Sequence, residues 1–538
     1  MKKLFLPLFL LLIFSCSQAQ LKEQADALLQ KAIPNNEHGL SVLVAQGDNI
    51  IYEKYHGYSE NESQNAIDEN TIFRIGSVTK QFTAASILKL AESNKLSLDD
   101  PLNKYIKDFP RGDEVTIHHL LTHTSGIKSY TDQPDFINTI EEPVSVDDLI
   151  EKIKQLGYDF DPGDKWKYNN SAYFILGHII ELQSGMSYEA FLEKHFFKPL
   201  GMNNTGIYDN SKSYKNEAIG YMAENGAIKP SLNWDMTWAG GAGNLYSTTH
   251  DLLKWNKAVF SGEILEKESI EKALTPVQLN DGSSHPYGYG WAITEYRGLK
   301  AIVHTGGLHG FLSVLSYYPE IDASVIVLSN ASPPLNVVPG NMAKELTQIF
   351  FEEHLEEQEE ISMEGAALEK YIGKYEYPGG AIMVVTLNDG QLYAQLTGQP
   401  RYEIYPKAED EFFWKVVDAQ VKFYSNENGE ITHGMHKQGG MEMKVPKMTE
   451  KEEISLPSGL FEKYAGEYSL NGTDVKIWEE EGAYYTQLQG QPKFRMYPMA
   501  NNRFFMKELA VEVEFGSGEP AESLTIFQAG NEMVAQRK

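Results

Sequence analysis

The last third of the chain contains two copies of one sequence unit, and this duplication constrains the fold more than any other feature. The matching segments are EKYIGKY at Glu369 with EKYAGEY at Glu462, and QLTGQPRYEIYP at Gln395 with QLQGQPKFRMYP at Gln487. The offsets between the copies are 462 − 369 = 93 and 487 − 395 = 92 residues. Because solenoid repeats are shorter, at about 20–50 residues, the sequence predicts a duplicated small domain over residues 366–450 and 458–538.

Each copy is expected to consist of short β-strands. Apolar runs of strand length alternate with turn signals, such as NDG at 388–390 and ENG at 427–429 in the first copy. Short strands separated by such turns are typical of a small antiparallel barrel or sandwich. The residue types that the copies share are Tyr, Phe, Gly, Gln and Pro, which suit a β core and its turns. A structural role is therefore favoured over a ligand-binding role for the tyrosine-rich face.

The residues before the repeats form a longer region of mixed pattern. Residues 39–58 contain two apolar runs around a turn and predict a hairpin, whereas residues 77–96 have a helical pattern. The segments AIVHTGG, LSVLSYYP and ASVIVLSN, between residues 301 and 330, are expected to be strands of one sheet. We predict a mixed α and β enzyme domain over residues 20–350, followed by an acidic linker over residues 351–365.

The charge of the chain limits the classes of partner. The formal net charge is −28, and a field of this sign repels both nucleic acid and anionic membranes. Neither is therefore expected as a partner, and the acidity is better explained by solubility. After the N-terminus, no apolar run approaches the ~20 residues that a membrane-spanning helix needs.

The first 19 residues, MKKLFLPLFLLLIFSCSQA, are typical of an export signal, with two lysines, an apolar run and then small residues. We favour cleavage after Ala19, which gives a periplasmic or secreted protein. The alternative is lipid attachment to Cys16, which gives an outer-membrane lipoprotein, although Phe14 fits that signal poorly. Because Cys16 is the only cysteine, cleavage after Ala19 leaves a mature protein without disulfides.

The pattern S-x-x-K pairs a serine with a lysine one helical turn away, which is the arrangement of a nucleophile with its base. Three of its occurrences are Ser77 with Lys80, Ser86 with Lys89, and Ser269 with Lys272. Ser77 follows a glycine at the predicted start of a helix, where its backbone N–H can stabilise an oxyanion. Ser86 lies further inside the same helix and Ser269 in a polar surface pattern, so position favours Ser77.

Two further patterns carry chemistry. YNN at 168–170 matches Y-x-N, in which the tyrosine can shuttle a proton and the asparagine can hold a lysine and a substrate amide. The same pattern occurs at 208–210, 214–216 and 424–426, so each match alone is more simply a turn. HTGG at 304–307 follows an apolar run, and its glycines would let the backbone approach a substrate closely. A lone histidine in such a place is more often structural.

In their order, these three patterns resemble those of the serine β-lactamase and penicillin-binding-protein superfamily. The resemblance extends over about residues 22–350 and includes TIHHLLTHTSGI, PLGMNNT, GGAGNLYSTTHDLLKW and YGYGW. It is closest to the branch with class C β-lactamases, D-Ala-D-Ala carboxypeptidases, D-aminopeptidases and esterases. The resemblance implies an antiparallel sheet flanked by helices, a helical subdomain, and an exported serine hydrolase with neither cofactor nor metal.

The resemblance also implies a role for each site residue. Ser77 would attack a carbonyl and become acylated, with Lys80 as the base either alone or together with Tyr168. Tyr168 would pass a proton to the leaving group, and Asn170 would bind the acyl amide of the substrate and orient Lys80. The backbone N–H groups of Ser77 and Gly307 would form the oxyanion hole. The implied substrate-binding strand consists of His304, Thr305, Gly306 and Gly307.

His304 stands where β-lactamases usually have a lysine. A histidine with a pKa near ~6.5 is only partly charged at neutral pH and is less suited to hold a substrate carboxylate. We therefore expect hydrolysis of an amide or ester bond in a small-molecule or peptide substrate, such as a D-amino-acid peptide or a carboxylic ester, in preference to a β-lactam. The alternative is a hydrolase-fold module of little or no activity that binds cell-wall or peptide ligands.

The histidines of IHHLLTHTSGI raise the possibility of a metal site. His119 and His123 have i, i+4 spacing, and His118 precedes them. The glutamate of an H-E-x-x-H zinc motif is missing, so packing is the expected role of these side chains and no metal is predicted.

Overall fold

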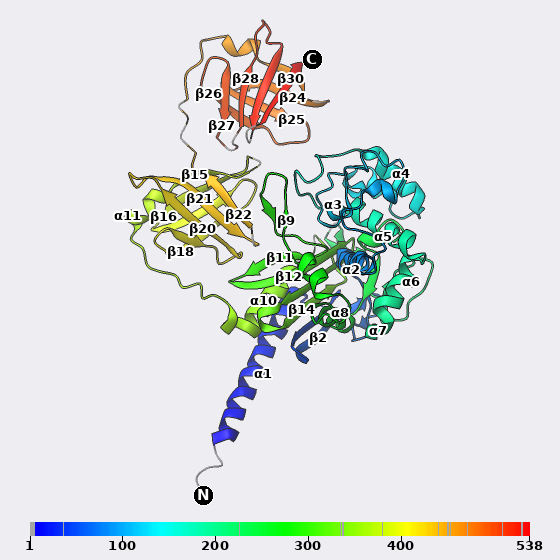
Figure 1. Ribbon diagram of the computed structural model, residues 1–538. Coiled ribbons are helices and arrows are strands. Elements are labelled where there is room, and N and C mark those ends of the chain that lie inside the picture. Colours follow the sequence, from blue (N-terminus) through cyan, green and yellow to red (C-terminus); the bar gives the residue numbers. More distant parts are fainter. Residues whose placement is uncertain are drawn as a thin grey trace. The chain divides into compact units, whose positions relative to one another are not determined.

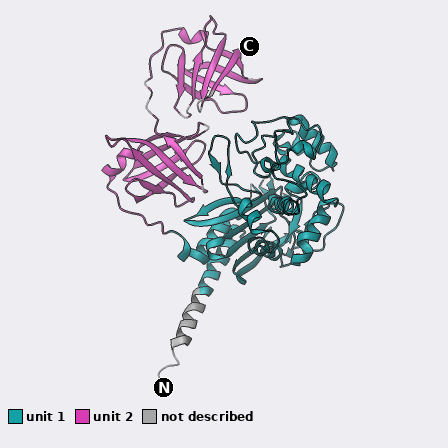
Figure 2. Cartoon of the chain, in the orientation of Figure 1, with its two compact units in different colours: residues 1–356 teal, residues 357–538 magenta. Residues whose placement is uncertain are grey.

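The computed structural model (Figure 1) describes residues 6–538, apart from residues 36, 225, 334, 336, 337, 379, 440, 449, 450, 452, 471, 508, 510, 529 and 530. Of residues 6–17 and 531 only the backbone is described. The chain forms two compact units, residues 1–356 and 357–538 (Figure 2).

The N-terminal segment is helical where it is described. Helix α1 spans Leu6–Ala32. The predicted cleavage after Ala19 is not tested, and the alternative anchor, the Cys16 side chain, lies outside the described residues. Within the described part of the chain, no helix is both long and apolar enough to cross a membrane.

The first unit contains a seven-stranded antiparallel sheet with the strand order β11-β12-β13-β14-β1-β2-β3. The strands are β1 (Gly39–Gln46), β2 (Asn49–Glu60), β3 (Asn65–Ala66), β11 (Ala292–Tyr296), β12 (Leu299–Leu308), β13 (Phe311–Tyr318) and β14 (Ala323–Ser329). The predicted hairpin and the predicted strands of one sheet are confirmed. Strand β1, the first along the chain, pairs with β14, the last of these strands along the chain, with Leu40 opposite Ser329.

Helices cover both faces of this sheet. Strands β1 and β14 are buried on both sides over almost their whole length, which explains why their sequences are continuously apolar rather than alternating. Helices α1 and α10 (Pro339–Phe351) pack on one face and share an apolar core with it. A larger core on the other face includes α2 (Thr79–Glu92), α5 (Asn170–Ser184) and α8 (Thr249–Phe260).

Shorter elements complete the first unit. The helices are α3 (Ile117–Leu121), α4 (Val146–Leu156), α6 (Tyr188–Leu192), α7 (Lys198–Leu200) and α9 (Lys267–Ala273). The strands are β4 (Phe73–Arg74), β5 (Gly206–Ile207), β6 (Tyr221–Glu224), β7 (Ala227–Pro230), β8 (Leu245–Ser247), β9 (Val277–Gln278) and β10 (Ser284–His285). Strand β8 pairs with β4 and β5, and this small sheet leads the chain into α2.

The segment after α10 packs differently from the expected linker. The chain continues as a short 3-10 helix, Glu352–His354, and remains part of the first unit to residue 356. Arg297 binds the Glu352 carboxylate at 3.0 Å and donates to the Glu356 carbonyl at 2.8 Å. The beginning of the acidic stretch is therefore attached to the first unit by the ion pair between Glu352 and Arg297 and by a hydrogen bond to the main chain at Glu356.

The second unit contains two eight-stranded antiparallel sheets. The first has β15 (Gly373–Glu376), β16 (Ile382–Asn388), β17 (Gln391–Leu396), β18 (Arg401–Ala408), β19 (Glu411–Phe413), β20 (Ala419–Ser425), β21 (Ile431–Gln438) and β22 (Met441–Pro446). The second has β23 (Gly466–Leu470), β24 (Thr473–Glu480), β25 (Ala483–Leu488), β26 (Phe494–Pro498), β27 (Arg503–Met506), β28 (Val511–Phe515), β29 (Ser523–Gln528) and β30 (Asn531–Arg537).

Both sheets curve around their own apolar cores. In the second sheet β23 pairs with β30 and closes a barrel, and in the first a bridge between Tyr375 and Lys447 links the two ends. The short helix α11 (Gly365–Leu368) precedes the first sheet. The prediction of small antiparallel barrels from the duplicated sequence is confirmed. We call them the first and the second barrel.

Candidate active site

Ser77 lies in a 3-10 turn, Gly76–Val78, that leads directly into α2. Its side chain is half-buried, whereas its neighbours on both sides are buried. Gly76 has φ +51°, and a Cβ at this position would lie 2.9 Å from the backbone nitrogen of Gly307. Only glycine therefore allows both this left-handed turn and the close approach of the strand that carries Gly307.

Lys80 lies one turn into α2 with its side chain completely buried. Its Nζ lies 3.1 Å from Ser77 Oγ, 2.8 Å from Asn170 Oδ1 and 2.8 Å from the carbonyl oxygen of Ala242. Burial holds the pKa of Lys80 well below its usual value, because the charged form loses its hydration. A neutral amine has two N–H groups and one lone pair. Two of the three neighbours can only accept, so the lone pair is left for the Ser77 hydroxyl.

The two asparagines of the Y-x-N pattern have different tasks. The Asn169 side chain caps α5 by accepting from the Ala172 N–H at 2.8 Å. Asn170 accepts from Lys80 through Oδ1 and donates through Nδ2 to Thr131 Oγ1 at 3.0 Å. Asn170 therefore fixes the position of the Lys80 amine, and Asn169 caps α5, the helix that begins with Asn170.

Tyr168 lies beside this pair. Lys80 Nζ is 4.7 Å from the centroid of its ring. Burial raises the pKa of Tyr168, and an interaction with the Ser77 hydroxyl offsets only part of this rise. Its buried hydroxyl makes no well-aligned hydrogen bond within the described part of the chain. Tyr168 is therefore a protonated phenol near the nucleophile.

Strand β12 forms the opposite wall of the site. A Cβ on Gly306 would lie 1.9 Å from the Ile75 carbonyl oxygen, so only glycine allows this contact. Ser313 on β13 donates to the same oxygen at 2.8 Å and ties the sheet to the turn with Ser77. The strand is thus held against the nucleophile turn, with Gly307 next to Gly76 and with an exposed Thr305.

His304 differs from the sequence-based expectation of a partly charged side chain. Its side chain is only 5% exposed. Nδ1 lies 2.6 Å from the Thr305 carbonyl oxygen, which can only accept, so Nδ1 carries the ring proton. Nε2 then accepts from the Tyr287 hydroxyl at 3.0 Å. Burial, assisted by the nearby Lys80, lowers the pKa of His304 to about 3. The expectation was wrong, because burial keeps this imidazole neutral and both its nitrogens are engaged.

A model of the beta-lactamase family matches residues 26–347, which is more than half of the chain. The chain belongs to the beta-lactamase family. A second family model, a domain of unknown function called DUF3471, matches residues 357–447 and covers the first barrel. Penicillin-binding protein 4* of Bacillus subtilis (strain 168) is 30% identical over 427 residues, which are 75% of this chain and 94% of that protein. Proteins of this family are serine hydrolases, and this chain is a beta-lactamase-related hydrolase.

Solved structures show the same fold. The octameric penicillin-binding protein homologue from Pyrococcus abyssi is 27% identical, with a TM-score of 0.55, and the match covers 79% of this chain and 99% of that one. D-amino acid amidase from Ochrobactrum anthropi SV3 is 22% identical, with a TM-score of 0.55 over 62% of this chain and 99% of that one. At that identity the likeness concerns the fold alone.

The beta-lactamase-family site contains a residue that sequence analysis assigned to packing. His123 has φ +62°, and its Nδ1 accepts from the Asn169 N–H at 3.1 Å. Its ring centroid lies 4.4 Å from that of Tyr168 and 4.7 Å from that of Tyr287. Its Nε2, which must carry the proton, is buried without a hydrogen-bond partner among the described residues. His123 thus supports the position of the Tyr168 ring, and no spacing rule indicated this contact.

The other histidines of the same segment have separate partners. His118 Nδ1 lies 2.8 Å from the Tyr289 hydroxyl. His119 Nδ1 accepts from the Thr116 N–H at 3.2 Å and completes the capping box of α3. Sequence analysis also missed the contact between Lys80 and the carbonyl oxygen of Ala242. Ala242 lies in GGAGNLYSTTHDLLKW, one of the segments that resemble the family, but its side chain has no functional group.

Proposed function

We propose that this protein hydrolyses an amide or ester bond through an acyl-enzyme on Ser77. The observation that carries the proposal is the environment of Lys80. A buried amine of lowered pKa has its two donors engaged by Asn170 and Ala242, and it lies 3.1 Å from Ser77 Oγ. A general base must lie within hydrogen-bond reach of the proton that it removes, and Lys80 meets this condition.

In the proposed first step, Ser77 Oγ attacks the substrate carbonyl carbon and its proton moves to Lys80 Nζ. The negative charge that develops on the carbonyl oxygen is stabilised by the backbone N–H groups of Ser77 and Gly307. Tyr168 donates its phenolic proton to the departing nitrogen or oxygen and regains one from Lys80. Water then attacks the carbonyl carbon of the Ser77 ester and gives up a proton to Lys80 Nζ. The C–O bond to Ser77 breaks, the acid is released, and Lys80 returns this proton to Ser77 Oγ, which restores both residues.

The structure favours Lys80 over Tyr168 as the base. Burial stabilises the neutral forms of both, and the neutral form of lysine is a base whereas the neutral form of tyrosine is an acid. Burial therefore favours opposite roles for the two groups, as in an acid and base pair.

The proposed substrates are D-amino-acid peptides or carboxylic esters in preference to β-lactams. The support is His304, a neutral and buried side chain at the place where a β-lactamase has a cation for the substrate carboxylate. We also propose that the protein is exported, as its N-terminal sequence predicts. The mass of the mature protein tests this. A start at Gln20 supports export with cleavage after Ala19, a start at lipid-modified Cys16 supports export as a lipoprotein instead, and an intact chain from Met1 contradicts export.

The acyl-enzyme is tested with a fluorescent fluorophosphonate, which labels activated serines. We expect labelling of the wild-type chain, complete loss in Ser77→Ala, and unchanged labelling in Ser86→Ala, the matched serine of the same helix. Labelling that persists in Ser77→Ala contradicts the assignment. A wild-type chain that is folded but is neither labelled nor active on esters supports a non-catalytic binding module instead.

The substrate class is tested with a panel of p-nitrophenyl esters, D-amino-acid amides and a chromogenic cephalosporin. We expect kcat/KM for the best ester or amide to exceed that for the cephalosporin. A cephalosporin that is hydrolysed fastest contradicts the proposed substrate class, although it leaves the acyl-enzyme on Ser77 intact.

A further inference from the structure

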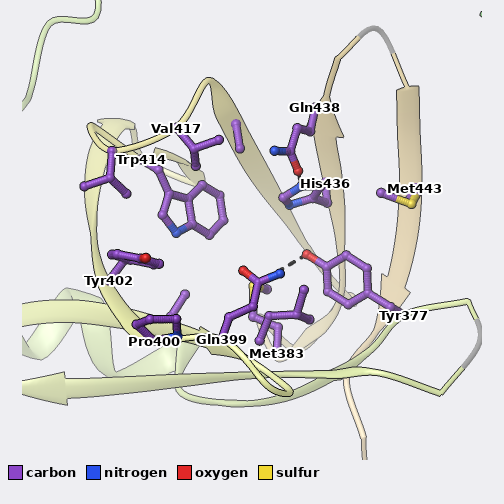
Figure 3. A pocket seen from close by; sticks show the side chains of 14 residues that line it. Tyr377, Met383, Gln399, Pro400, Tyr402, Trp414, Val417, His436, Gln438 and Met443 are labelled. Atoms are coloured by element: carbon purple, nitrogen blue, oxygen red, sulfur yellow. Dashed lines mark hydrogen bonds between the residues drawn. The ribbon is translucent and has the colours of Figure 1, made fainter. Parts of the chain in front are cut away.

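The first barrel contains a cavity of about 380 Å³ at the end of the barrel where β15, β17, β19 and β21 finish (Figure 3). This volume is in the range of small-molecule sites in proteins, about 300–1,000 Å³. Its inner wall is formed by buried side chains of which the largest are Trp414, Tyr377 and His436. Its rim carries apolar side chains that solvent reaches, with Val416 64% exposed and Val417 39% exposed.

His436 gives the cavity a specific polar group. Its ring is 6% exposed and lies at 5.5 Å from the Trp414 ring and 5.4 Å from the Tyr377 ring, between centroids. Nε2 lies 3.3 Å from Gln438 Oε1, which can only accept, so Nε2 carries the proton. Nδ1 is therefore an acceptor, and within the described part of the chain it has no hydrogen-bond partner. A buried acceptor without a partner is unfavourable, and a bound donor would relieve this.

The lining excludes charged ligands. None of the 14 residues around the cavity is an Asp, Glu, Lys or Arg. Methionine, leucine, alanine, valine and proline side chains form most of the remaining surface, together with the amides of Gln399 and Gln438. An ion placed here would lose its hydration without a countercharge, whereas a neutral ring would gain contacts with Trp414 and Tyr377.

The second barrel has the same strand pairing but different residues at the corresponding positions. Val421 pairs with His436 in the first barrel, and its counterpart Val513 pairs with Ile526 in the second. The residue after Phe413 is Trp414, and the residue after its counterpart Phe505 is Met506. The second barrel therefore has the same strand pairs with Met506 and Ile526 at these positions. The fold does not require Trp414 and His436 there.

We propose that the first barrel binds a small uncharged molecule with a ring-sized apolar body and one hydrogen-bond donor, its ring against Trp414 and its donor on His436 Nδ1. The Tyr377 hydroxyl lies on the same side of the cavity as His436 (Figure 3). It donates to Met383 Sδ at 3.8 Å, which is a weak acceptor. The site is independent of Ser77 and of the reaction proposed there.

The test measures binding of three matched naphthalenes to the full-length protein by equilibrium dialysis. 2-Naphthol has the ring and the donor, 2-methoxynaphthalene has the ring alone, and 2-naphthoate adds a charge. We expect 2-naphthol to bind with a Kd below about 1 mM, and the other two to bind at least ~10-fold more weakly. None of the three has a bond that the proposed active site would cleave.

The variants copy the second barrel into the first. His436→Ile should weaken 2-naphthol ~10-fold and leave 2-methoxynaphthalene unchanged, because only the donor contact is lost. Trp414→Met should weaken both ~10-fold. The matched control is His433→Ile, on the same strand, since His433 stacks on Tyr424 outside the cavity and its loss should change neither affinity.

Val417→Trp provides a second route that leaves the inner wall intact. This exposed rim position should accept the larger side chain, which then obstructs the entrance and weakens 2-naphthol ~10-fold. Thermal melting shows that each variant is folded before its affinity is compared. The proposal is overturned if 2-naphthol does not bind at millimolar concentration, if 2-naphthoate binds best, or if the folded variants bind 2-naphthol as the wild type does.

Discussion

The S-x-x-K pattern stands both at the start of α2 and further along this helix, in two different environments. At the start, Ser77 is half-buried in the 3-10 turn before the helix, and Lys80 is fully buried among three polar atoms. In the third turn the burial is reversed. Ser86 is fully buried and donates to the Phe82 carbonyl at 2.7 Å, whereas the Lys89 side chain is 36% exposed.

The difference lies in what the rest of the fold brings to each lysine. Lys89 Nζ donates to the Ile264 carbonyl at 2.8 Å and lies 3.8 Å from the Glu92 carboxylate, a partner that stabilises the charged amine. Lys80 meets neutral acceptors and no carboxylate among the described contacts of its Nζ. We propose that Lys80 is a base because burial removes both water and a countercharge from its amine, and the sequence pattern alone contains neither condition.

The largest expected effect comes from removing each lysine in turn. Lys80→Met should lower the rate of Ser77 acylation ~10³-fold, because general-base catalysis contributes about 10²–10⁴. Lys89→Met should change it less than ~2-fold, since its amine does not contact the site. Single-turnover kinetics with a p-nitrophenyl ester measure both. Equal losses in the two variants would mean that the lysines act through helix stability and not through the chemistry.

A smaller effect should separate Asn170 from Asn169. Asn170→Ala leaves the Lys80 amine without one of its acceptors and should reduce kcat ~10²-fold with little change in stability. Asn169→Ala removes the cap of α5 and should reduce the free energy of unfolding by ~1 kcal/mol. Urea unfolding and ester kinetics on the same preparations give both quantities. If Asn170→Ala loses stability and keeps its activity, the asparagine is structural.

The pH profile is expected to show the smallest effect per step, about tenfold per pH unit on the acid side. The pKa of Lys80 is lowered by burial, and its unprotonated form is the base. Activity should therefore be retained as the pH rises above this pKa, and it should fall as the pH drops through it. The same limb should not come from His304, whose pKa of about 3 leaves it neutral throughout. A profile for His304→Gln that loses the acid limb would reverse this assignment.

Sequence analysis predicted the side chains to which the proposed chemistry is assigned. Ser77, Lys80, Tyr168 and Asn170 stand in patterns whose order is characteristic, and the structure brings the first three within one cluster with Asn170 on the lysine. Their roles remain proposals. The two barrels could be predicted equally well, because a repeated sequence with turn signals is compatible with few folds.

Burial and backbone contacts could not be predicted in the same way. The neutral state of His304 depends on Tyr287 and on a backbone carbonyl, and the contact of His123 with Tyr168 depends on a left-handed turn. The acceptor from Ala242 is a main-chain atom, which any residue could supply. These features arise only when segments far apart in the sequence are packed together, and no local pattern encodes them.

The strand order of the sheet also sets when the catalytic apparatus can come into existence. Ser77 and Gly307 are 307 − 77 = 230 residues apart, and strand β1, which pairs with β2 on one side, gains its other partner only when β14 is complete at Ser329. A growing polypeptide therefore contains Ser77 long before β12, the strand with Gly307, has been synthesised. Pairing between strands this far apart in the sequence is also slow. On the proposed mechanism, nascent or truncated chains that lack β12 have no oxyanion donor from Gly307, and we expect hydrolysis only from the complete domain.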